Sequence, residues 1–327
     1  MSLLPQPSAI FMTLKPANLE SQHLFDELSQ AIIANTQDRK IKTPELEHAA
    51  KFMFIERFAG LQFSGQEIPI EQREIATELD TEVDDASTVS EKMPLYQGHY
   101  NFAFRDADPL VPRQGWVVGF GRFNHKKRGS TSSSDRPDVL LALPGTSGKK
   151  YEVAGKHARI FFDQEGTLTL KVFSQRGFPT VIGNTDIGKG QRSITERESR
   201  VSFGSLSYIL EFAKEMTEET FQAGLREYTK QNGIFEQNQS LWPDFSATPS
   251  PMDHLVGDWN IRSTVGKGTF GTVNATKNVR TGICAAAKKL IRKSNDDVLK
   301  IGREINTLRI LPSNVNSLFL PSSLLDI

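Results

Sequence analysis

The stretch Val265-Gly-Lys-Gly-Thr-Phe-Gly-Thr-Val273 decides how the C-terminal part of the chain folds. Its glycines, Gly266, Gly268 and Gly271, carry no Cβ and let the backbone approach a triphosphate closely. A dinucleotide-binding fingerprint with this glycine spacing opens a helix and meets an acidic residue about 20 positions later. Here the chain continues as the strand-like run Thr272-Val-Asn-Ala-Thr-Lys277. The sequence therefore predicts a β-hairpin whose backbone amides face phosphate oxygens.

A second strand and a helix are expected after the hairpin. The strand-like run Thr281-Gly-Ile-Cys-Ala-Ala-Ala-Lys-Lys-Leu290 ends with two adjacent lysines before its last residue. Glu304 lies within the expected helix, which starts at about Ser294, and its carboxylate can point inward. The apolar residues of this helix recur at helical spacing, at Val298, Ile301, Ile305 and Leu308.

This order of parts resembles the small lobe of a eukaryotic-type protein kinase, over the range from Leu255 to about Phe319. A small lobe contains a glycine-rich loop, then a strand lysine, then a helix glutamate. The resemblance implies that the loop covers the phosphates of ATP, that Lys288 holds the α- and β-phosphates, and that Glu304 orients Lys288 through an ion pair. It also implies that Val273 and Ala286 sandwich the adenine.

The resemblance names a set of ATP-binding residues. They are Val265, Gly266, Lys267, Gly268, Thr269, Phe270, Gly271, Val273, Ala286, Lys288, Lys289 and Glu304. Lys289 is the alternative to Lys288, because the Ala-Ala-Lys-Lys run can be aligned one residue later. The other interpretation of the whole stretch is a glycine hairpin with exposed lysines and no nucleotide.

The parts of a kinase that transfer phosphate are not found in this sequence. A large lobe carries a His-Arg-Asp catalytic loop and an Asp-Phe-Gly metal site. None of the six histidines is followed by Arg-Asp, and Asp-Phe-Gly does not occur. We therefore expect no catalytic residue and no metal ligand before the chain stops at Ile327. The interpretation is a serine/threonine kinase that is truncated, with a decayed kinase as the alternative. ATP binding is expected to be weak or vestigial, and Mg²⁺ is expected only with a full-length large lobe.

The middle of the chain is predicted to be a β-sandwich or barrel. Short apolar runs, separated by Gly, Pro, Asn and Asp, dominate residues 96–212. Two features resemble a forkhead-associated (FHA) domain, a β-sandwich that reads phosphothreonine peptides. They are Gly121-Arg122 after an apolar strand and the run Gly155-Lys-His-Ala-Arg-Ile160. The resemblance extends from about Trp116 to Phe212, and a fused kinase is a familiar pairing in signalling.

The FHA resemblance implies a phosphate site on the sandwich. A phosphate carries about −1.5 to −2 charge and offers three strong acceptors. Arg122 would bind it bidentately, as guanidinium geometry allows. Lys156 or Arg159 would add positive charge, and His157 would act as a buttress that holds the loop.

Two departures from the FHA pattern affect this site. The family's serine three places before the histidine is Ala154 here, and its Ser-x-Asn-Gly is Ser174-Gln-Arg-Gly177. Two hydrogen bonds to a charged ligand are thereby lost unless Arg176 compensates, at about 1.5–3 kcal/mol each. The alternative function of the chain is therefore a non-catalytic phosphopeptide-binding or interaction module with a vestigial ATP lobe. The other interpretation of the sandwich itself is a scaffold without a phosphate site.

The remaining predictions concern the domain boundaries of a multidomain α+β chain. Residues 1–92 are expected to be a helical and acidic region of unknown role, and residues 93–212 the FHA-like sandwich. Residues 213–254 are expected to form a helix, over Thr217–Lys230, and a proline-containing linker. Residues 255–327 are expected to be the partial small lobe, an antiparallel sheet with one helix.

Within the N-terminal region, residues 1–17 are expected to be a loose lead-in and a helix is expected from Asn18. A second helix opens at Thr43 and is expected to place apolar residues on one face as far as Phe54. The acidic residues 67–91 are interpreted as a solvated linker.

Composition excludes several classes of function. Of 327 residues, 39 are Lys or Arg and 39 are Asp or Glu, so the formal charge is zero and no nucleic-acid partner is expected. Cys284 is the only cysteine, which excludes an intrachain disulfide and favours a reducing compartment. No signal peptide or transmembrane segment is found, so we expect an intracellular protein of the cytoplasm or nucleus without a membrane partner. The expected partner is a phosphothreonine-containing protein.

Overall fold

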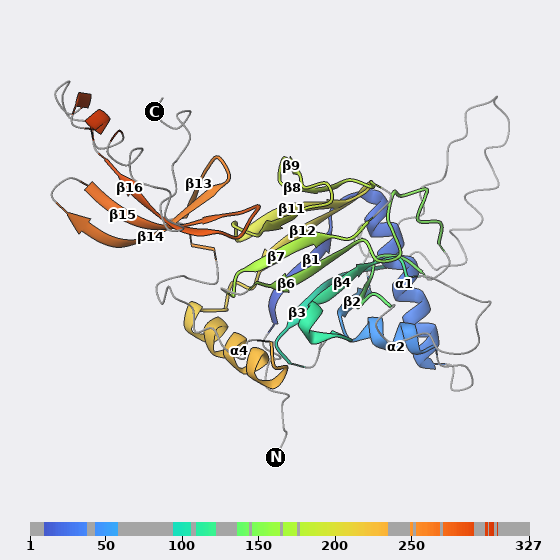
Figure 1. Ribbon diagram of the computed structural model, residues 1–327. Coiled ribbons are helices and arrows are strands. Elements are labelled where there is room, and N and C mark those ends of the chain that lie inside the picture. The colour runs from blue at the N-terminus through green and yellow to red at the C-terminus, as the bar shows by residue number, and fades with distance from the viewer. Residues whose placement is uncertain are drawn as a thin grey trace, which may run out of the picture.

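The computed structural model describes a β-rich chain with few helices. It describes residues 10–37, 43–57, 94–105, 109–121, 136–143, 146–163, 166–174, 177–234, 249–250, 253–268, 271–290, 298–299, 301–303 and 306. Within these ranges the strands form three sheets, of seven, five and four strands (Figure 1).

The seven-stranded sheet has the order β2-β3-β1-β12-β11-β8-β9. Its strands are β1 (Ile10–Pro16), β2 (Met53–Arg57), β3 (Tyr96–Ala103), β8 (Thr180–Ile182), β9 (Thr185–Asp186), β11 (Glu198–Phe203) and β12 (Leu206–Phe212). All neighbours are antiparallel, and β1 lies between β3 and β12.

The five-stranded sheet has the order β10-β7-β6-β4-β5. Its strands are β4 (Trp116–Gly119), β5 (Val139–Leu140), β6 (Ala158–Phe162), β7 (Leu168–Val172) and β10 (Gln191–Ser193). The side chains of β6 alternate between buried and half-buried, as expected for a strand with one face on a core. The strands β4, β5, β6 and β7 coincide with apolar runs from which the sequence predicts a sandwich, whereas β10 does not.

The core lies between these two sheets. Phe11 on β1 contacts Trp116 on β4, with ring centroids 5.4 Å apart, and Trp116 contacts Phe162 on β6 at 6.0 Å. All three rings are buried. Because aromatic rings of both sheets interdigitate, the two sheets pack face to face as a β-sandwich, to which β1 and β2 contribute from outside the range 96–212 that the sequence predicts.

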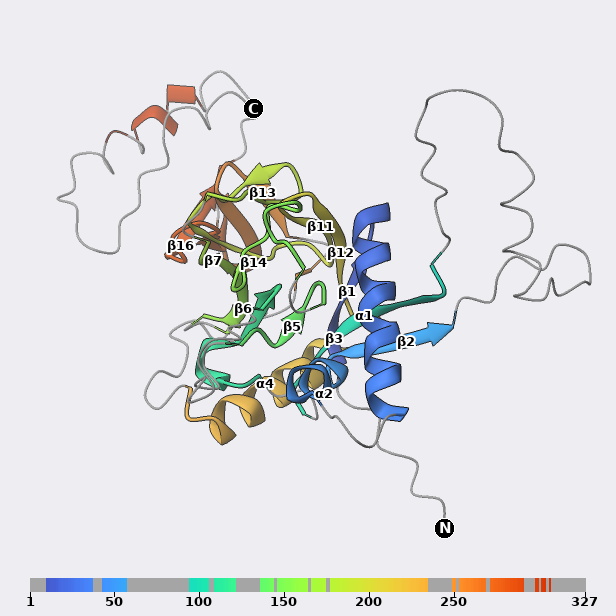
Figure 2. The ribbon, with the colours of Figure 1, turned by 90° about the vertical axis from the view of Figure 1, so that its right-hand side faces the viewer.

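Helices cover the sandwich at two places. Phe25 of α1 (Leu19–Gln37) packs edge-on against Tyr100 of β3 at 5.3 Å, so α1 lies against the seven-stranded sheet (Figure 2). The ring centroid of Phe221, on α4 (Glu218–Gln231), lies 5.7 Å from that of Phe11. Two short helical elements are α2 (Pro44–Ala50) and η1 (Pro112–Gln114). Among the described residues, no helix has the length and apolar character needed to cross a bilayer.

The N-terminal expectations need two corrections. Residues 10–16 are a central strand, not a loose lead-in, because β1 pairs with both β3 and β12. The second helix ends at Ala50, and residues 53–57 form β2, in which Phe54 pairs with His99. Strand pairing therefore overrides the helical pattern that extends to Phe54.

The division into domains stays a prediction. Nevertheless β1 and β2 lie before the expected boundary at residue 93, and both belong to the same sheet as β12. The acidic residues 67–91 lie outside the described residues. The helix expected from Asn18 is confirmed as α1, which spans Leu19–Gln37.

The four-stranded sheet contains the expected glycine hairpin. Its antiparallel strands are β13 (His254–Val256), β14 (Trp259–Gly268), β15 (Gly271–Asn278) and β16 (Cys284–Lys289), in that order. Gly268 pairs with Gly271 across the hairpin. Of the helix expected from Ser294, residues 298–299, 301–303 and 306 have helical backbone, and the rest lies outside the described residues.

Candidate functional site

The register of β15 and β16 brings three of the expected ATP-binding residues to one face of the sheet. Val273 lies opposite Lys288, and Ala275 lies opposite Ala286. Directly paired residues of antiparallel strands share a face, and residues two apart along a strand also share a face. Val273, Ala286 and Lys288 therefore lie on the same face. Lys289 pairs with Thr272 and lies on the opposite face.

The three glycines of the hairpin differ in what the fold requires of them. Gly271 has a φ of +146°, and a Cβ there would lie 2.1 Å from the carbonyl oxygen of Lys289. Only glycine fits this position. A Cβ on Gly266 or Gly268 would meet nothing within 4 Å, and neither residue has a positive φ. The described fold thus explains Gly271 and leaves open space beside the other two glycines.

The hairpin end of this sheet is open to solvent. Val265 is 43% exposed, and Lys267 and Gly268 are also exposed. Val273 is half-buried, and the side chains of Ala286 and Lys288 are exposed. The face that carries these residues is therefore accessible to a ligand.

Part of the expected ATP site cannot be placed. Thr269, Phe270 and Glu304 lie outside the described residues, so the ion pair between Lys288 and Glu304 stays a prediction. Lys289 is exposed, on the face that does not carry Val273.

A charged pair, which the sequence interpretation missed, lies at the other end of β15 and joins a buried lysine to a half-buried aspartate. The Nζ of Lys277 donates to Oδ2 of Asp163 at 2.6 Å and to Oγ1 of Thr167 at 3.0 Å. Only 2% of the Lys277 side chain is exposed. Lys277 follows Val273 by four residues, so strand alternation alone places this lysine on the same face. Strand alternation was the available signal for the face on which Lys277 lies. It could not identify Asp163 as the partner of Lys277, because the two residues are 114 positions apart in the sequence.

A second buried cation lies on the neighbouring strand β14. Arg262 Nε is 3.4 Å from Oδ2 of Asp253, and 2% of its side chain is exposed. Burial lowers the pKa of Arg262 below its ordinary value, and the carboxylates of Asp253, Glu218 and Asp163 partly oppose this shift. The four-stranded sheet therefore has polar groups buried at the end that lies away from the glycine hairpin.

On the sandwich, His157 is buried and held by two hydrogen bonds. The backbone N–H of Ala154 donates to Nδ1 at 3.1 Å, and Nε2 lies 2.8 Å from Oγ1 of Thr180. Because Nδ1 accepts, we assign the ring proton to Nε2, which then donates to Thr180. Burial lowers the pKa of His157 to about 4, partly offset by the backbone of Pro179. A neutral imidazole in this position holds the loop before β6 in place.

The other expected phosphate-binding residues are only partly described. The guanidinium carbon of Arg159 lies 4.3 Å from the ring centroid of Phe161 and 5.4 Å from that of Phe173. Burial lowers the pKa of Arg159. Lys156 is half-buried, and Arg122 and Arg176 lie outside the described residues. Arg159 therefore packs on aromatic rings.

Ser174 is the described residue of the altered Ser-x-Asn-Gly motif. Its side chain is 2% exposed, and its Oγ has no hydrogen-bond partner among the described residues. Its backbone N–H donates to the carbonyl oxygen of His157 at 3.2 Å. Ser174 and His157 therefore lie side by side.

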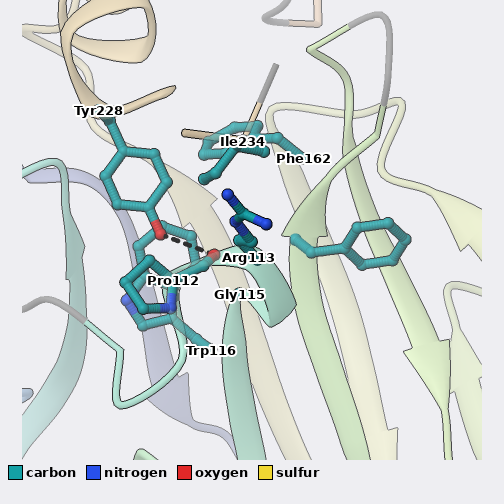
Figure 3. A pocket seen from close by; sticks show the side chains of 8 residues that line it. Pro112, Arg113, Gly115, Trp116, Phe162, Tyr228 and Ile234 are labelled. Atoms are coloured by element: carbon teal, nitrogen blue, oxygen red, sulfur yellow. Dashed lines mark hydrogen bonds between the residues drawn. The ribbon is translucent and has the colours of Figure 1, made fainter. Parts of the chain in front are cut away.

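A small pocket lies between α4 and the sandwich (Figure 3). Tyr228 donates a hydrogen bond to the carbonyl oxygen of Pro112 at its rim, over 3.3 Å. The pocket contains none of the residues expected to bind ATP or phosphopeptide. It is lined by Pro112, Arg113, Gly115, Trp116, Phe161, Phe162, Tyr228 and Ile234. Within the described part of the chain, no group of three or more His, Cys, Asp or Glu side chains is arranged to hold a metal ion.

Comparisons with known proteins give partial similarities. No model of a known protein family matches the chain. Over 68 residues the chain is 43% identical to myosin-IIIb of Mus musculus, a match that covers 21% of this chain and 5% of myosin-IIIb. The chain is also similar to the crystal structure of Rad53 1-466 in complex with AMP-PNP. That similarity has 20% identity and a TM-score of 0.30, and it covers 60% of this chain and 40% of the Rad53 chain. What those whole proteins do therefore extends to this chain only as a proposal.

Proposed function

We propose that this chain belongs to an FHA-containing serine/threonine protein kinase of the cell interior. In this proposal the four-stranded sheet is the ATP-binding small lobe and the sandwich is the FHA domain. The observation that carries the proposal is the β15–β16 register, in which Val273 lies opposite Lys288 on the face that Ala286 shares. An adenine between Val273 and Ala286 would place its phosphates toward the glycine hairpin and Lys288.

The register favours Lys288 over Lys289 as the phosphate-binding lysine. Lys289 lies on the face opposite to Val273 and Ala286, because it pairs with Thr272. An amine on that face points away from a nucleotide bound against Val273. The alignment that shifts the lysine by one residue is therefore disfavoured.

The glycines support the same proposal. Glycine in a strand interior costs stability, since it has no side chain to pack and it loses more backbone entropy. Gly266 and Gly268 meet no neighbour that would exclude a Cβ. Close approach of a phosphate group to the backbone provides the reason for glycine at these two positions.

The proposed chemistry of this stretch is nucleotide binding. Phosphoryl transfer also needs a base for the substrate hydroxyl and carboxylate or amide ligands for Mg²⁺. The sequence contains neither His-Arg-Asp nor Asp-Phe-Gly. We therefore propose that these residues bind ATP weakly, and that phosphorylation of a protein belongs to a longer form with a large lobe.

Titration of the full chain with ATP tests the proposal, using Lys288→Met and its neighbour Lys289→Met as a matched control. A hydrogen bond to a charged group is worth about 1.5–3 kcal/mol. Lys288→Met should therefore weaken ATP binding roughly tenfold to a hundredfold, whereas Lys289→Met should change it by less than about threefold. Equal losses in the two variants, or no saturable binding by the unmodified chain, would contradict the proposal.

A second proposed function is phosphothreonine-peptide binding by the sandwich. The buried, neutral His157 and the adjacent Ser174, whose Oγ has no described partner, support it. A phosphothreonine peptide library should bind the full chain and lose most of its affinity in Arg122→Ala. The exposed Arg113 provides the control Arg113→Ala. Equal binding by both variants would leave the sandwich as a scaffold without a phosphate site.

A further inference from the structure

An ion pair between the buried Lys277 and the half-buried Asp163 joins the four-stranded sheet to the sandwich. Lys277 of β15 donates the 2.6 Å hydrogen bond to Asp163, which follows β6. Next to it, the backbone N–H of Ser193 on β10 donates to the carbonyl oxygen of Val279 at 2.8 Å. Figure 1 shows the four-stranded sheet beside the sandwich, and these bonds define where they meet.

Asp163 is held in place from the sandwich side. Its Oδ1 accepts from the backbone N–H of Thr167 at 2.9 Å, and its Oδ2 accepts from Oγ1 of Thr169 at 3.3 Å. The carboxylate is therefore oriented by the β6–β7 turn itself. Burying a lysine side chain as deeply as that of Lys277 is costly unless an acceptor such as Asp163 pairs with it.

The pair connects two strands that end at candidate sites. Lys277 shares its face of β15 with Val273, at the glycine hairpin. Asp163 lies directly after β6, and His157 lies directly before β6. The pair therefore restrains β15 at the end that lies away from the glycine hairpin, and it restrains the β6–β7 turn at Asp163.

We infer that the Asp163–Lys277 pair is a latch through which the sandwich positions the ATP-binding hairpin. The inference rests on the proposed ATP site. The two states are the latched pair and a state in which the four-stranded sheet has separated from the β6–β7 turn. ATP prefers the latched state, so ATP binding stabilises the turn, and by reciprocity the latched turn raises ATP affinity. Asp163 and Lys277 are positioning residues in this scheme.

Hydrogen exchange of the full chain tests the latch without any nucleotide. The variant Asp163→Asn keeps the oxygen that accepts from Thr167 and removes the charge that Lys277 needs. We expect the backbone amides of β15 to exchange at least about fivefold faster in Asp163→Asn, while those of β12 are unchanged. The control Glu227→Gln removes the carboxylate of an exposed ion pair with Arg105 and should change neither strand.

If Asp163→Asn unfolds the sandwich, the variant Lys277→Met provides the same test, because Lys277 belongs to the four-stranded sheet and its substitution changes no residue of the sandwich. β15 exchange that stays equal to that of the unmodified chain in both variants overturns the latch. The double variant that combines Asp163→Asn and Lys277→Met should lose little more protection in β15 than either single variant, because both substitutions remove the same ion pair. Strictly additive effects on β15 exchange overturn the inference as well.

ATP then separates the latch from the proposed function. In the unmodified chain, ATP should slow exchange in both β15 and the β6–β7 turn. In Asp163→Asn, ATP should bind at least about fivefold more weakly and leave the turn unprotected. Turn protection that survives in Asp163→Asn overturns the latch. If ATP binds none of the proteins, the ATP site is wrong, whereas the nucleotide-free exchange still decides whether the pair holds the two parts together.

Discussion

At the scale of single residues, the glycine hairpin separates structural from functional requirements. Gly271 has a positive φ and lies where a Cβ would collide with a backbone oxygen, 2.1 Å away. Gly266 has open space on the side of its missing Cβ. Glycine is therefore required by the backbone conformation at position 271, whereas at position 266 we assign it to the approach of a ligand. Substitution by alanine distinguishes the two cases.

Gly271→Ala should lower the free energy of unfolding of the four-stranded sheet by about 1–3 kcal/mol, because backbone must move to remove the collision. Gly266→Ala should leave stability unchanged or raise it by up to about 1 kcal/mol, yet weaken ATP binding. Chemical denaturation and ATP titration of both variants measure these effects. Loss of stability in Gly266→Ala with ATP affinity unaltered would assign this glycine to the fold.

At the scale of elements, the sequence predicted those helices and strands that are determined by interactions between residues close together in the chain. The helix α4 was predicted almost to the residue, since Thr217 caps it, accepting from the N–H of Thr220 at 3.2 Å, and Gly233 with a φ of 57° follows its end. The strand β1 was missed because its pairing partner is distant, with Thr13 opposite Glu211. Its state depends on β12, which no window around residue 13 contains.

The same contrast applies to the candidate site. The glycine spacing and the two lysines marked the candidate ATP site from sequence alone, because two short runs close together in the chain carry that pattern. The choice between Lys288 and Lys289 required the register, which the strand pairing supplies. The pair of Lys277 and Asp163 was inaccessible to sequence reasoning, since only the packing of the four-stranded sheet on the sandwich brings them together.

At the scale of the whole molecule, the β-rich chain combines a sandwich and a smaller sheet with an open hairpin end and a buried, charged end. Burying Lys277 is costly unless its partner is present. The arrangement of the two parts is therefore specified by a small number of polar groups at their junction. Through the latch that we infer, this junction connects the candidate ATP site mechanically to the sandwich.

The central claim is that a nucleotide binds on the face of Val273, Ala286 and Lys288. An acyl-phosphate derivative of ATP tests it most directly, because it acylates an amine that lies beside the bound phosphates, and mass spectrometry then identifies the modified lysine. The account predicts acylation of Lys288 that excess ATP suppresses. Acylation of Lys289 in place of Lys288, or labelling that excess ATP does not reduce, would contradict it.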